Sequence, residues 1–311
     1  MSEATAYVVS LALLLVGAVI IPWLAMRALV PTLETSSRGQ VENYAGRPVV
    51  VGLGLVWLVW SLALLLVTFI DSAYASLFSA EGVPIFGEFA VEGLPFVLIL
   101  GTLALGMADD FLGSSVDKGF RGHLSALFHG RLTTGALKLL GIGLLAAFAT
   151  MPDLGALDVS LWVIVRDWVL QVLAIALTAN LINLTDLRPG RALKVYSLLS
   201  VLGCIVLGFS WAWSIVPLFA LILLGPVIAV WSFDVHERAM LGDAGANVAG
   251  ALVGWMIGIA LMPWWWALAA YVVVVFTLNF ASERVSFSGV IDKTPVLRWL
   301  DGLGRQNSPT I

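Results

Sequence analysis

The sequence predicts an all-α, polytopic membrane protein: a helical bundle of about nine transmembrane helices, with ten as the alternative count. Three observations carry this prediction. Of the 311 residues, 60% are hydrophobic and only 12% are charged, about half the charged share of an ordinary soluble domain. The apolar residues fall into long runs separated by short polar segments. Cys204, the single cysteine, lies inside one such run, which excludes an intrachain disulfide and a cysteine metal cluster.

The apolar runs define the expected membrane spans, because a helix needs about 20 apolar residues to cross the hydrocarbon core of a bilayer. The first run has Glu3 and no basic residue ahead of it, which argues for a retained helix rather than a cleaved signal peptide. The third run is short and ends in two aspartates, so we expect its polar end to be recessed into protein or water. The expected spans are 7–30, 48–70, 94–107, 135–150, 161–182, 192–209, 213–231, 246–262 and 265–281.

Basic residues predict the orientation of these spans. The connections 71–93 and 152–160 contain acidic residues and no Lys or Arg. In a nine-helix arrangement, all 16 Lys and Arg residues except Arg166 fall on the opposite side. Because cytoplasmic connections carry the excess of Lys and Arg, we expect the N-terminus outside and the C-terminus in the cytoplasm of a multi-pass plasma-membrane protein.

We expect residues 1–311 to form one integral membrane domain with a cytoplasmic tail at 282–311. Thr294-Pro295 is a helix-start signal, since a capping hydroxyl precedes proline in the first turn. The residues that follow interleave apolar side chains with Arg298 and Asp301. This pattern predicts a short amphipathic helix on the inner membrane surface.

Four segments on the expected cytoplasmic side place polar residues beside apolar helices. Asp109 and Asp110 follow directly on an apolar run. In the second segment, Asn180, Asn183 and Asp186 stand at three-residue steps and would share one helix face. The other two segments are the string 241–247 around Asp243 and the early loop 43–48, which contains Asn43 and Arg47.

These polar residues have a common chemistry. Carboxylates at membrane depth are costly unless they are paired, hydrated or metal-bound, and they usually mark function. Oxygen ligands without cysteine suit a hard cation, with Mg²⁺ as the natural ion and Mn²⁺ as the alternative. Nearby Lys and Arg side chains suit phosphate oxygens. The residues alone therefore indicate metal-assisted transfer of a phosphate-containing group at the membrane surface.

Each segment also has a structural interpretation. Asp109-Asp110 can be a solvated helix end, Asp186 a turn residue, and Asp243 part of a helix-capping turn. The 13 tryptophans are typical of interfacial belts. Taken one at a time, several interfacial cations and histidines are ordinary surface residues: Lys118, Arg121, Arg131, His123, His129 and His236. The functional interpretation is favoured because all four polar segments share one membrane side.

The ordered set Asp109-Asp110, Asn180–Asp186 and Leu241-Gly242-Asp243-Ala244-Gly245 resembles the polyprenyl-phosphate N-acetylhexosamine-1-phosphate transferase superfamily, which includes phospho-N-acetylmuramoyl-pentapeptide transferase. The resemblance runs from about Asn43 to Asn247. It implies transfer of a sugar-1-phosphate from a UDP-linked nucleotide-sugar to undecaprenyl phosphate or another polyprenyl phosphate. The reaction uses Mg²⁺, releases a nucleoside monophosphate and serves the biogenesis of cell-wall or envelope polysaccharides.

The resemblance also implies roles for the matched residues. Asp109 would position or deprotonate the lipid phosphate, and Asp110 would lie near the metal and the donor phosphates. Asp243 would bind Mg²⁺ together with Asp110. Asn183 and Asp186 would lie on the nucleotide side. The remaining substrate-binding candidates are Asn43, Arg47, Lys118, Arg121, His123, Asn180, Arg188, Arg191 and Lys194. A cation clamp of this kind lowers the repulsion between two reacting phosphates.

Two departures from the family pattern bear on the donor. Pro189 lies where the best-known members have a second aspartate, and 282–289 lacks their histidine-rich loop. We hypothesise that Arg188 and Arg191 grip the donor phosphates instead. Two other functions stay open: a transporter or flippase with cation-coupled aspartates, and a family member that binds polyprenyl phosphate without catalysis. Membrane lipids are expected partners, nucleic acid is not, and a homodimer stays open beside a monomer.

Overall fold

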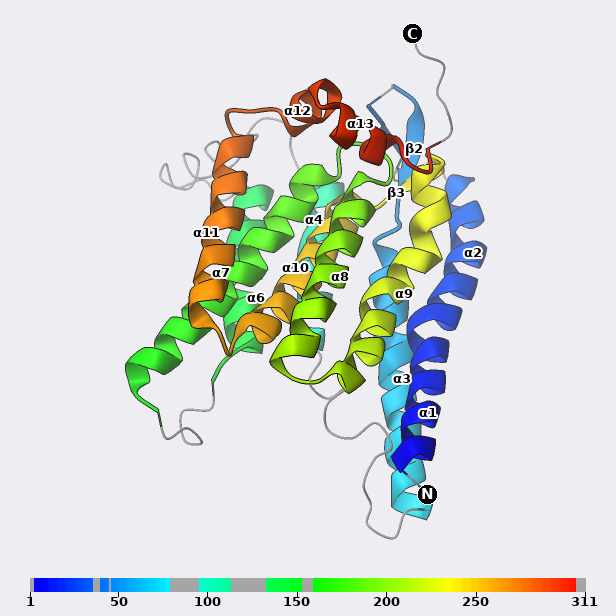
Figure 1. Cartoon of the computed structure of the whole chain (residues 1–311). Coiled ribbons are helices and arrows are strands. Elements are labelled where there is room, and N and C mark those ends of the chain that lie inside the picture. The colour runs from blue at the N-terminus through cyan, green and yellow to red at the C-terminus, as the bar shows by residue number, and fades with distance from the viewer. Residues whose placement is uncertain are drawn as a thin grey trace.

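The computed structural model of the chain describes residues 3–35, 40–44, 46–78, 95–112, 133–152 and 159–305. Within these ranges the protein is a helical bundle with one small sheet, in agreement with the predicted all-α class (Figure 1). The elements are α1 (Glu3–Leu14), the π-helix η1 (Leu15–Ile20), α2 (Ile21–Glu34), β1 (Gln40–Glu42), β2 (Pro48–Val51), α3 (Leu55–Phe78), α4 (Phe96–Leu112), α6 (Thr134–Ala149), α7 (Leu161–Thr185), α8 (Arg191–Ser210), the 3₁₀ turn η2 (Trp213–Ile215), α9 (Val216–Val235), β3 (Ala239–Met240), α10 (Gly242–Leu261), α11 (Trp265–Ser282), α12 (Phe287–Lys293) and α13 (Pro295–Gly302).

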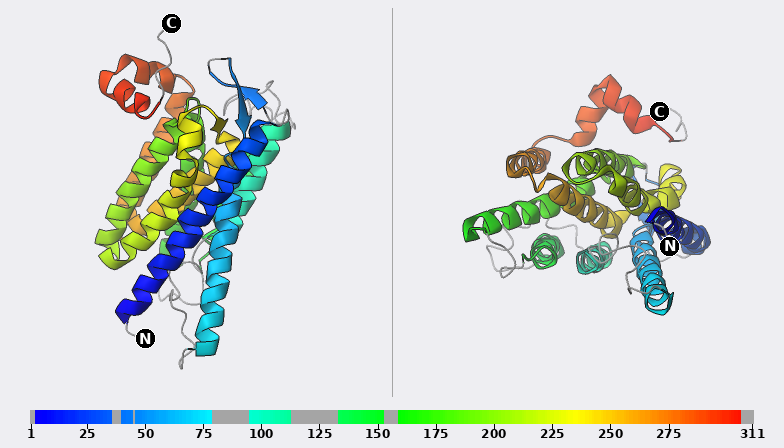
Figure 2. Two further views of the ribbon diagram at one scale, coloured as in Figure 1. Left: turned by 90° about the vertical axis from the view of Figure 1, so that its right-hand side faces the viewer. Right: turned by 60° about the horizontal axis from the view of Figure 1, so that its bottom comes forward.

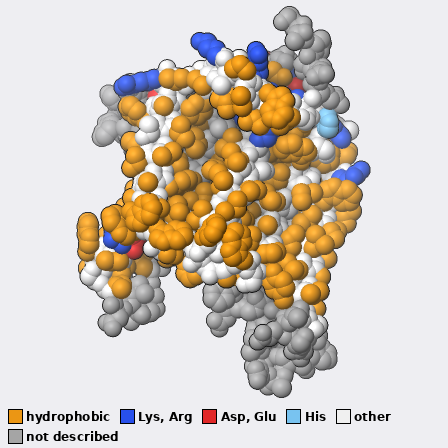
Figure 3. Space-filling view, viewed as in Figure 1, with side chains coloured by type: hydrophobic (Ala, Val, Ile, Leu, Met, Phe, Trp, Pro, Cys, Tyr) orange, Lys and Arg blue, Asp and Glu red, His pale blue; other side chains and the backbone are white. Residues whose placement is uncertain are grey.

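Several helices are long and apolar enough to cross a membrane. In the described residues there are six: Tyr7–Glu34, α7, α8, Trp213–Val235, α10 and α11. The apolar stretches Leu55–Ile70 and Gly135–Ala149 are shorter, and α4 has 17 residues. Hydrophobic side chains cover most of the face shown in Figure 3, with most of the visible Lys and Arg side chains toward its upper end. The protein is therefore of the membrane class, while the count of nine spans and the orientation remain predictions.

The second expected span, 48–70, needs a correction. Residues Pro48–Val51 form strand β2, and the helix begins only at Leu55. The β-branched run Val49–Val51 favours a strand, and Gly52 and Gly54 interrupt any helix that would start before them. β2 pairs antiparallel with β1, with Val41 opposite Val49, and parallel with β3, with Val50 opposite Ala239.

The small sheet and the C-terminal helices lie at one end of the bundle, which we call the sheet end. The described N-terminal residues lie at the opposite end (Figure 1). Helices α12 and α13 lie across the sheet end rather than along the bundle axis (Figure 2). The sheet joins the segment after α2 to the segment before α10, so residues from both halves of the chain meet there.

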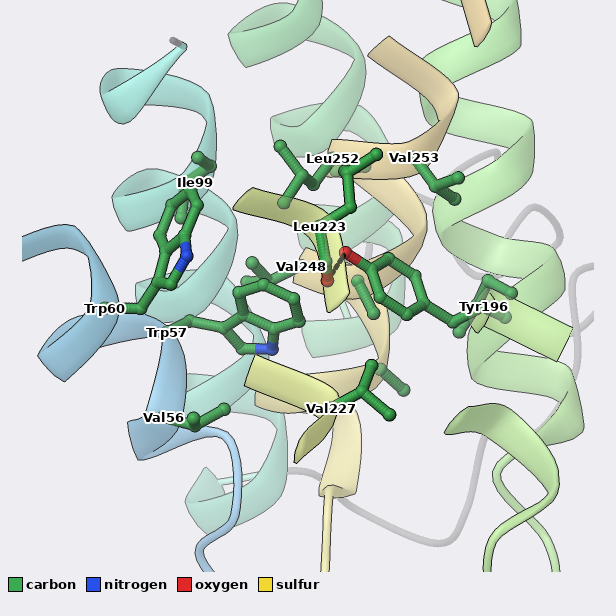
Figure 4. Close-up of a cluster of buried hydrophobic side chains, with 14 of the residues drawn as sticks. Val56, Trp57, Trp60, Ile99, Tyr196, Leu223, Val227, Val248, Leu252 and Val253 are labelled. Carbon is green, nitrogen blue, oxygen red and sulfur yellow. Dashed lines mark hydrogen bonds between the residues drawn. The ribbon is translucent and has the colours of Figure 1, made fainter. Parts of the chain in front are cut away.

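Helix α10 is the centre of the bundle, and nearly all of its side chains are buried. It packs closely on α7 because glycines remove side chains from the contact. A Cβ atom at Gly250 would lie 2.5 Å from the Ala179 Cα atom, and one at Gly254 would lie 2.9 Å from the Ala174 carbonyl oxygen. Such small-residue spacing is typical of tightly packed membrane helices. Beside α10, Trp57, Trp60 and Tyr196 fill the core, and the Tyr196 hydroxyl donates to the Leu223 carbonyl at 2.8 Å (Figure 4).

Candidate active site

A buried lysine joins two of the predicted aspartates. Lys138 lies in the second turn of α6, and its Nζ atom is 2.7 Å from Asp109 Oδ2 and 2.5 Å from Asp243 Oδ2. Its side chain is 9% exposed, and the Asp109 side chain is 15% exposed. A charge removed from water in this way needs opposite charges close by, and here two carboxylates supply them. The end of α4, the start of α6 and the start of α10 therefore converge on one point.

Asp110 caps helix α10 across a tertiary contact. Its Oδ1 atom accepts the Asp243 backbone N–H at 2.9 Å, and its Oδ2 atom accepts the Ala244 N–H at 3.0 Å. Free N–H groups at a helix start attract a carboxylate, so this contact stabilises α10 and fixes α4 beside it. The close approach requires Gly106, where a Cβ atom would lie 2.5 Å from Ala244 Cα. Asp110 therefore has a structural role whatever else it binds.

Asp186 completes the group at the end of α7. It follows the last helical residue, Thr185, and its carboxylate accepts a hydrogen bond from the Gly242 backbone. Burial, and then the negative charges of Asp234 and Asp243, raise the pKa of Asp186 well above its usual value. Burial is the main cause of this shift, and the neighbouring carboxylates add to it. We refer to Asp109, Asp110, Lys138, Asp186 and Asp243 as the acidic cluster.

The two asparagines predicted beside Asp186 behave differently. Asn183 lies one turn earlier on α7, half-buried, and its carbonyl accepts the Asp186 N–H at 3.1 Å. The Asn180 side chain instead donates to Asn279 Oδ1 of α11 at 2.6 Å, and Asn279 in turn donates to the Leu177 carbonyl. Asn180 therefore ties α7 to α11.

Asn43 and Arg47 lie in the β1–β2 turn and gather around Glu237. Asn43 Nδ2 donates to Glu237 Oε2 at 2.9 Å, and the exposed Arg47 Nη1 atom is 3.5 Å from the same oxygen. The Tyr44 hydroxyl donates to Glu237 Oε1 at 3.1 Å. Glu237 has a φ of 57°, an uncommon backbone conformation for a residue with a side chain. These contacts hold the hairpin against the segment that leads into Asp243.

Three basic residues that were predicted to bind the substrate form ion pairs or hydrogen bonds with the C-terminal tail. Arg188 donates to Asp292 of α12 at 3.0 Å and lies over the Tyr44 ring. Arg191 forms a buried ion pair with Asp301 of α13, and Lys194 donates to the Asp301 carbonyl. The guanidinium groups of Arg188 and Arg191 are therefore paired with carboxylates, and gripping donor phosphates would require them to exchange these partners.

Lys118, Arg121 and His123 lie outside the described residues, as do Arg131 and His129. In the other direction, the structure adds two residues that were not among the predicted site residues: Lys138, and Asp234 at the end of α9. Both had the same signal in the sequence, a lone charge near the end of an otherwise apolar run. A charge placed there is expensive unless it has a partner, so each could have been added to the candidates.

The cluster fits a divalent cation in one binding mode. No group of three or more His, Cys, Asp or Glu side chains within the described ranges is arranged to hold a metal ion. The residues therefore do not form a cage made by the protein alone. Mg²⁺, however, is commonly held by one or two carboxylates, with water and substrate phosphates completing its shell. Asp243 lies in the first turn of α10, and Asp110 of α4 contacts that turn, so these two carboxylates suit binding of Mg²⁺ together with water and phosphate.

Comparison with protein-family models and with curated proteins found no significant match to this chain.

Proposed function

We propose that the protein is a Mg²⁺-dependent transferase that moves a sugar-1-phosphate from a nucleotide-sugar to polyprenyl phosphate. The sugar-1-phosphate that we propose is an N-acetylhexosamine-1-phosphate. The observation that carries this proposal is the acidic cluster. Its members come from four helix ends that are remote in sequence, and all lie at the sheet end. The sequence motifs that resemble the superfamily contain these same aspartates.

In this proposal a lipid phosphate oxygen forms a bond to the sugar-bearing phosphorus of the nucleotide-sugar. The bond from that phosphorus to the bridging oxygen breaks, and its electron pair leaves with the nucleoside monophosphate. Asp109 orients the lipid phosphate and takes its remaining proton, which requires an ionised carboxylate. The ammonium group of Lys138 lies 2.7 Å from Asp109 Oδ2 and so holds this carboxylate in place.

Asp243 and Asp110 would hold the divalent cation, with Asn183 and Asp186 on the nucleotide side. When bound, Mg²⁺ supplies positive charge to the diphosphate, which lowers the repulsion between two anionic reactants. Lys138 lies between Asp109 and Asp243 and therefore can donate to a phosphate oxygen that enters between them. The substrates brought together are thus a membrane lipid and a water-soluble nucleotide.

The direct test uses purified protein, undecaprenyl phosphate and a panel of nucleotide-sugars, with and without Mg²⁺. Release of nucleoside monophosphate together with a labelled lipid product is the expected result. Asp109→Asn and Asp243→Asn should abolish it, whereas Asp167→Asn, at the opposite end of α7, is a matched carboxylate control. Wild-type activity that needs no divalent metal would remove the mechanism.

The same purified protein separates the alternative functions. Flux of lipid or cation across vesicles without product formation would favour a transporter or flippase. Binding of undecaprenyl phosphate without turnover for any donor would favour a non-catalytic family member.

The proposal places the sheet end in the cytoplasm, where nucleotide-sugars are made available. In a protein with Cys204→Ser, a cysteine at exposed Ser160 should react with an impermeant thiol reagent added outside intact cells. One at exposed Val285 should react only after the membrane is opened. Labelling of Val285→Cys from outside would reverse the orientation.

A further inference from the structure

The C-terminal tail is fastened to the beginning of α8 by a buried ion pair. Arg191 Nε and Nη2 donate to the two carboxylate oxygens of Asp301 at 2.9 and 3.0 Å, and Nη1 donates to Ser288 Oγ at 2.8 Å. The Arg191 and Asp301 side chains are 4% and 7% exposed. A bidentate pair at this depth has fixed geometry, and no water can replace a lost partner.

Two more cations converge on Asp301. Arg305 Nη2 donates to Asp301 Oδ1 at 2.9 Å, and Arg305 Nε donates to the Pro189 carbonyl at 2.8 Å. Lys194 Nζ donates to the Asp301 carbonyl oxygen. Burial alone would raise the pKa of Asp301, but the Arg191 hydrogen bond and the Arg305 charge lower it below its usual value. We call Arg191, Lys194, Asp301 and Arg305 the tail cluster.

The loop between α7 and α8 is held from its other side as well. The Gly190 N–H donates to Asp234 Oδ2 of α9 at 2.9 Å, and Gly190 has a φ of 71°, a conformation that favours glycine. At the start of the same loop, Asp186 lies against Gly242, next to Asp243. The loop is therefore clamped between α9 and the tail, with a member of the acidic cluster at one end.

We propose that the tail is a strap that fixes the α7–α8 loop, and that Arg191 and Asp301 are positioning residues for the site. This inference rests on the proposed function, in which Asp186 lies on the nucleotide side. Arg191 acts on the donor through the position of the loop and does not touch the donor phosphates. The tail is then part of the site's architecture.

The structure offers a matched control. Arg188 and Asp292 also join the loop to the tail, with Arg188 Nη2 3.0 Å from Asp292 Oδ2. Their side chains are 28% and 45% exposed, so water can replace either partner. The two pairs have the same chemistry and connect the same two segments, and they differ in burial.

The first experiment measures hydrogen–deuterium exchange of the amides in 186–191, in full-length protein in detergent. Asp301→Asn should speed exchange there by at least about tenfold, because it leaves a buried arginine without its counter-charge. Asp292→Asn should change it by less than about twofold. Arg305→Gln is a milder variant in case Asp301→Asn does not fold, and it should give an intermediate increase. Unchanged exchange in both tail-cluster variants would overturn the strap.

The second experiment measures kcat and KM for both substrates. Asp301→Asn should raise the donor KM by at least about tenfold and the lipid KM by less than about twofold, because only the loop moves. Asp301→Glu, which keeps the charge, should restore part of the donor affinity. A fall in kcat alone, with both KM values unchanged, would mean ordinary destabilisation and would overturn the positioning role. If the wild type makes no lipid product, the proposed function fails, while the exchange experiment still decides whether the tail fixes the loop.

Discussion

The acidic cluster and the tail cluster lie at the same end of the bundle and are built from opposite imbalances of charge. The acidic cluster has four carboxylates and one ammonium group, that of Lys138, which contacts two of them. In the tail cluster, three cations bind Asp301: Arg191 and Arg305 at its carboxylate, and Lys194 at its backbone carbonyl. Asp234 lies beside the loop that joins them, since its Oδ2 atom accepts the Gly190 N–H at 2.9 Å.

The difference lies in geometry as well as in sign. Arg191 and Asp301 meet in a bidentate pair, which is complete without a further ligand. Lys138 instead bridges two carboxylates that approach from different helices, and more negative charge lies beside them. A matched pair holds parts of a protein together, whereas crowded carboxylates favour the binding of an additional cation. The comparison therefore indicates that the tail cluster holds two segments together, whereas the acidic cluster is suited to binding a ligand.

Removing the lysine should have the largest effect. Lys138→Met leaves Asp109 and Asp243 facing each other without a counter-charge, so the unfolding free energy should fall by about 3–5 kcal/mol in the absence of divalent metal. Added Mg²⁺ should restore part of this loss. Thermal unfolding in detergent with EDTA or Mg²⁺ measures both effects. Lys293→Met, at an exposed position, is the control. A Lys138→Met protein as stable as this control would mean that the bridge contributes nothing.

A smaller effect should divide the acidic cluster itself. Asp110→Ala removes the acceptor for two N–H groups at the start of α10 and should lower stability by about 0.5–2 kcal/mol. Asp109→Asn should lower stability less, because Lys138 keeps Asp243 as a partner, yet it should abolish product formation. Chemical unfolding and turnover on the same preparations test this division. Equal losses of stability would contradict the capping role of Asp110.

Acid should release the tail without first disturbing the bundle. The folded pKa of Asp301 is below its usual value. Docking is therefore fully stabilised above the ordinary aspartate pKa of about 4 and weakens as the pH falls through the lowered folded value. A spin label at exposed Val296, in Cys204→Ser protein, should become more mobile below about pH 4. In Asp301→Asn the label should be mobile at every pH, and an unchanged profile there would contradict the assignment.

The smallest effect is expected at the opposite end of the bundle. Arg166 and Asp167 form a partly exposed pair between adjacent residues, and Arg166 also lies over the Trp265 ring. Asp167→Asn should change the unfolding free energy by less than about 1 kcal/mol and leave turnover unchanged. A loss as large as that of Lys138→Met would show that burial does not distinguish these ion pairs.

Much of the bundle could be predicted from the sequence, because hydrophobic runs of membrane length fix helix positions almost independently of tertiary structure. Asp109, Asp110, Asp186 and Asp243 could likewise be singled out, since each lies at or next to the end of an apolar helix. Strand β2 could not, because its three valines are as apolar as a membrane helix and differ only in the partner they find in β3.

The partners of the charged side chains could not be predicted from the sequence either. Arg191 has the composition and position of a phosphate ligand, and its actual partner, Asp301, lies more than a hundred residues further along the chain. In the sequence, Lys138 is one of the many Lys and Arg residues expected on the cytoplasmic side. No local pattern distinguishes a lysine that anchors a helix end from one that bridges two distant aspartates. Both assignments depend on which helix ends meet, which the helix pattern leaves undetermined.

The parallel pairing of β2 with β3 has a consequence for how the protein is made. Val50 leaves the ribosome long before its partner Ala239, with most of the bundle between them. At a synthesis rate of about 5–20 residues per second, β2 waits for roughly 10–40 s. During that time the N-terminal helices can enter the bilayer, while their connecting hairpin stays without its third strand. The segment that leads into Asp243 is thus completed late, so a chain stalled before β3 holds most of its membrane helices but has no assembled site.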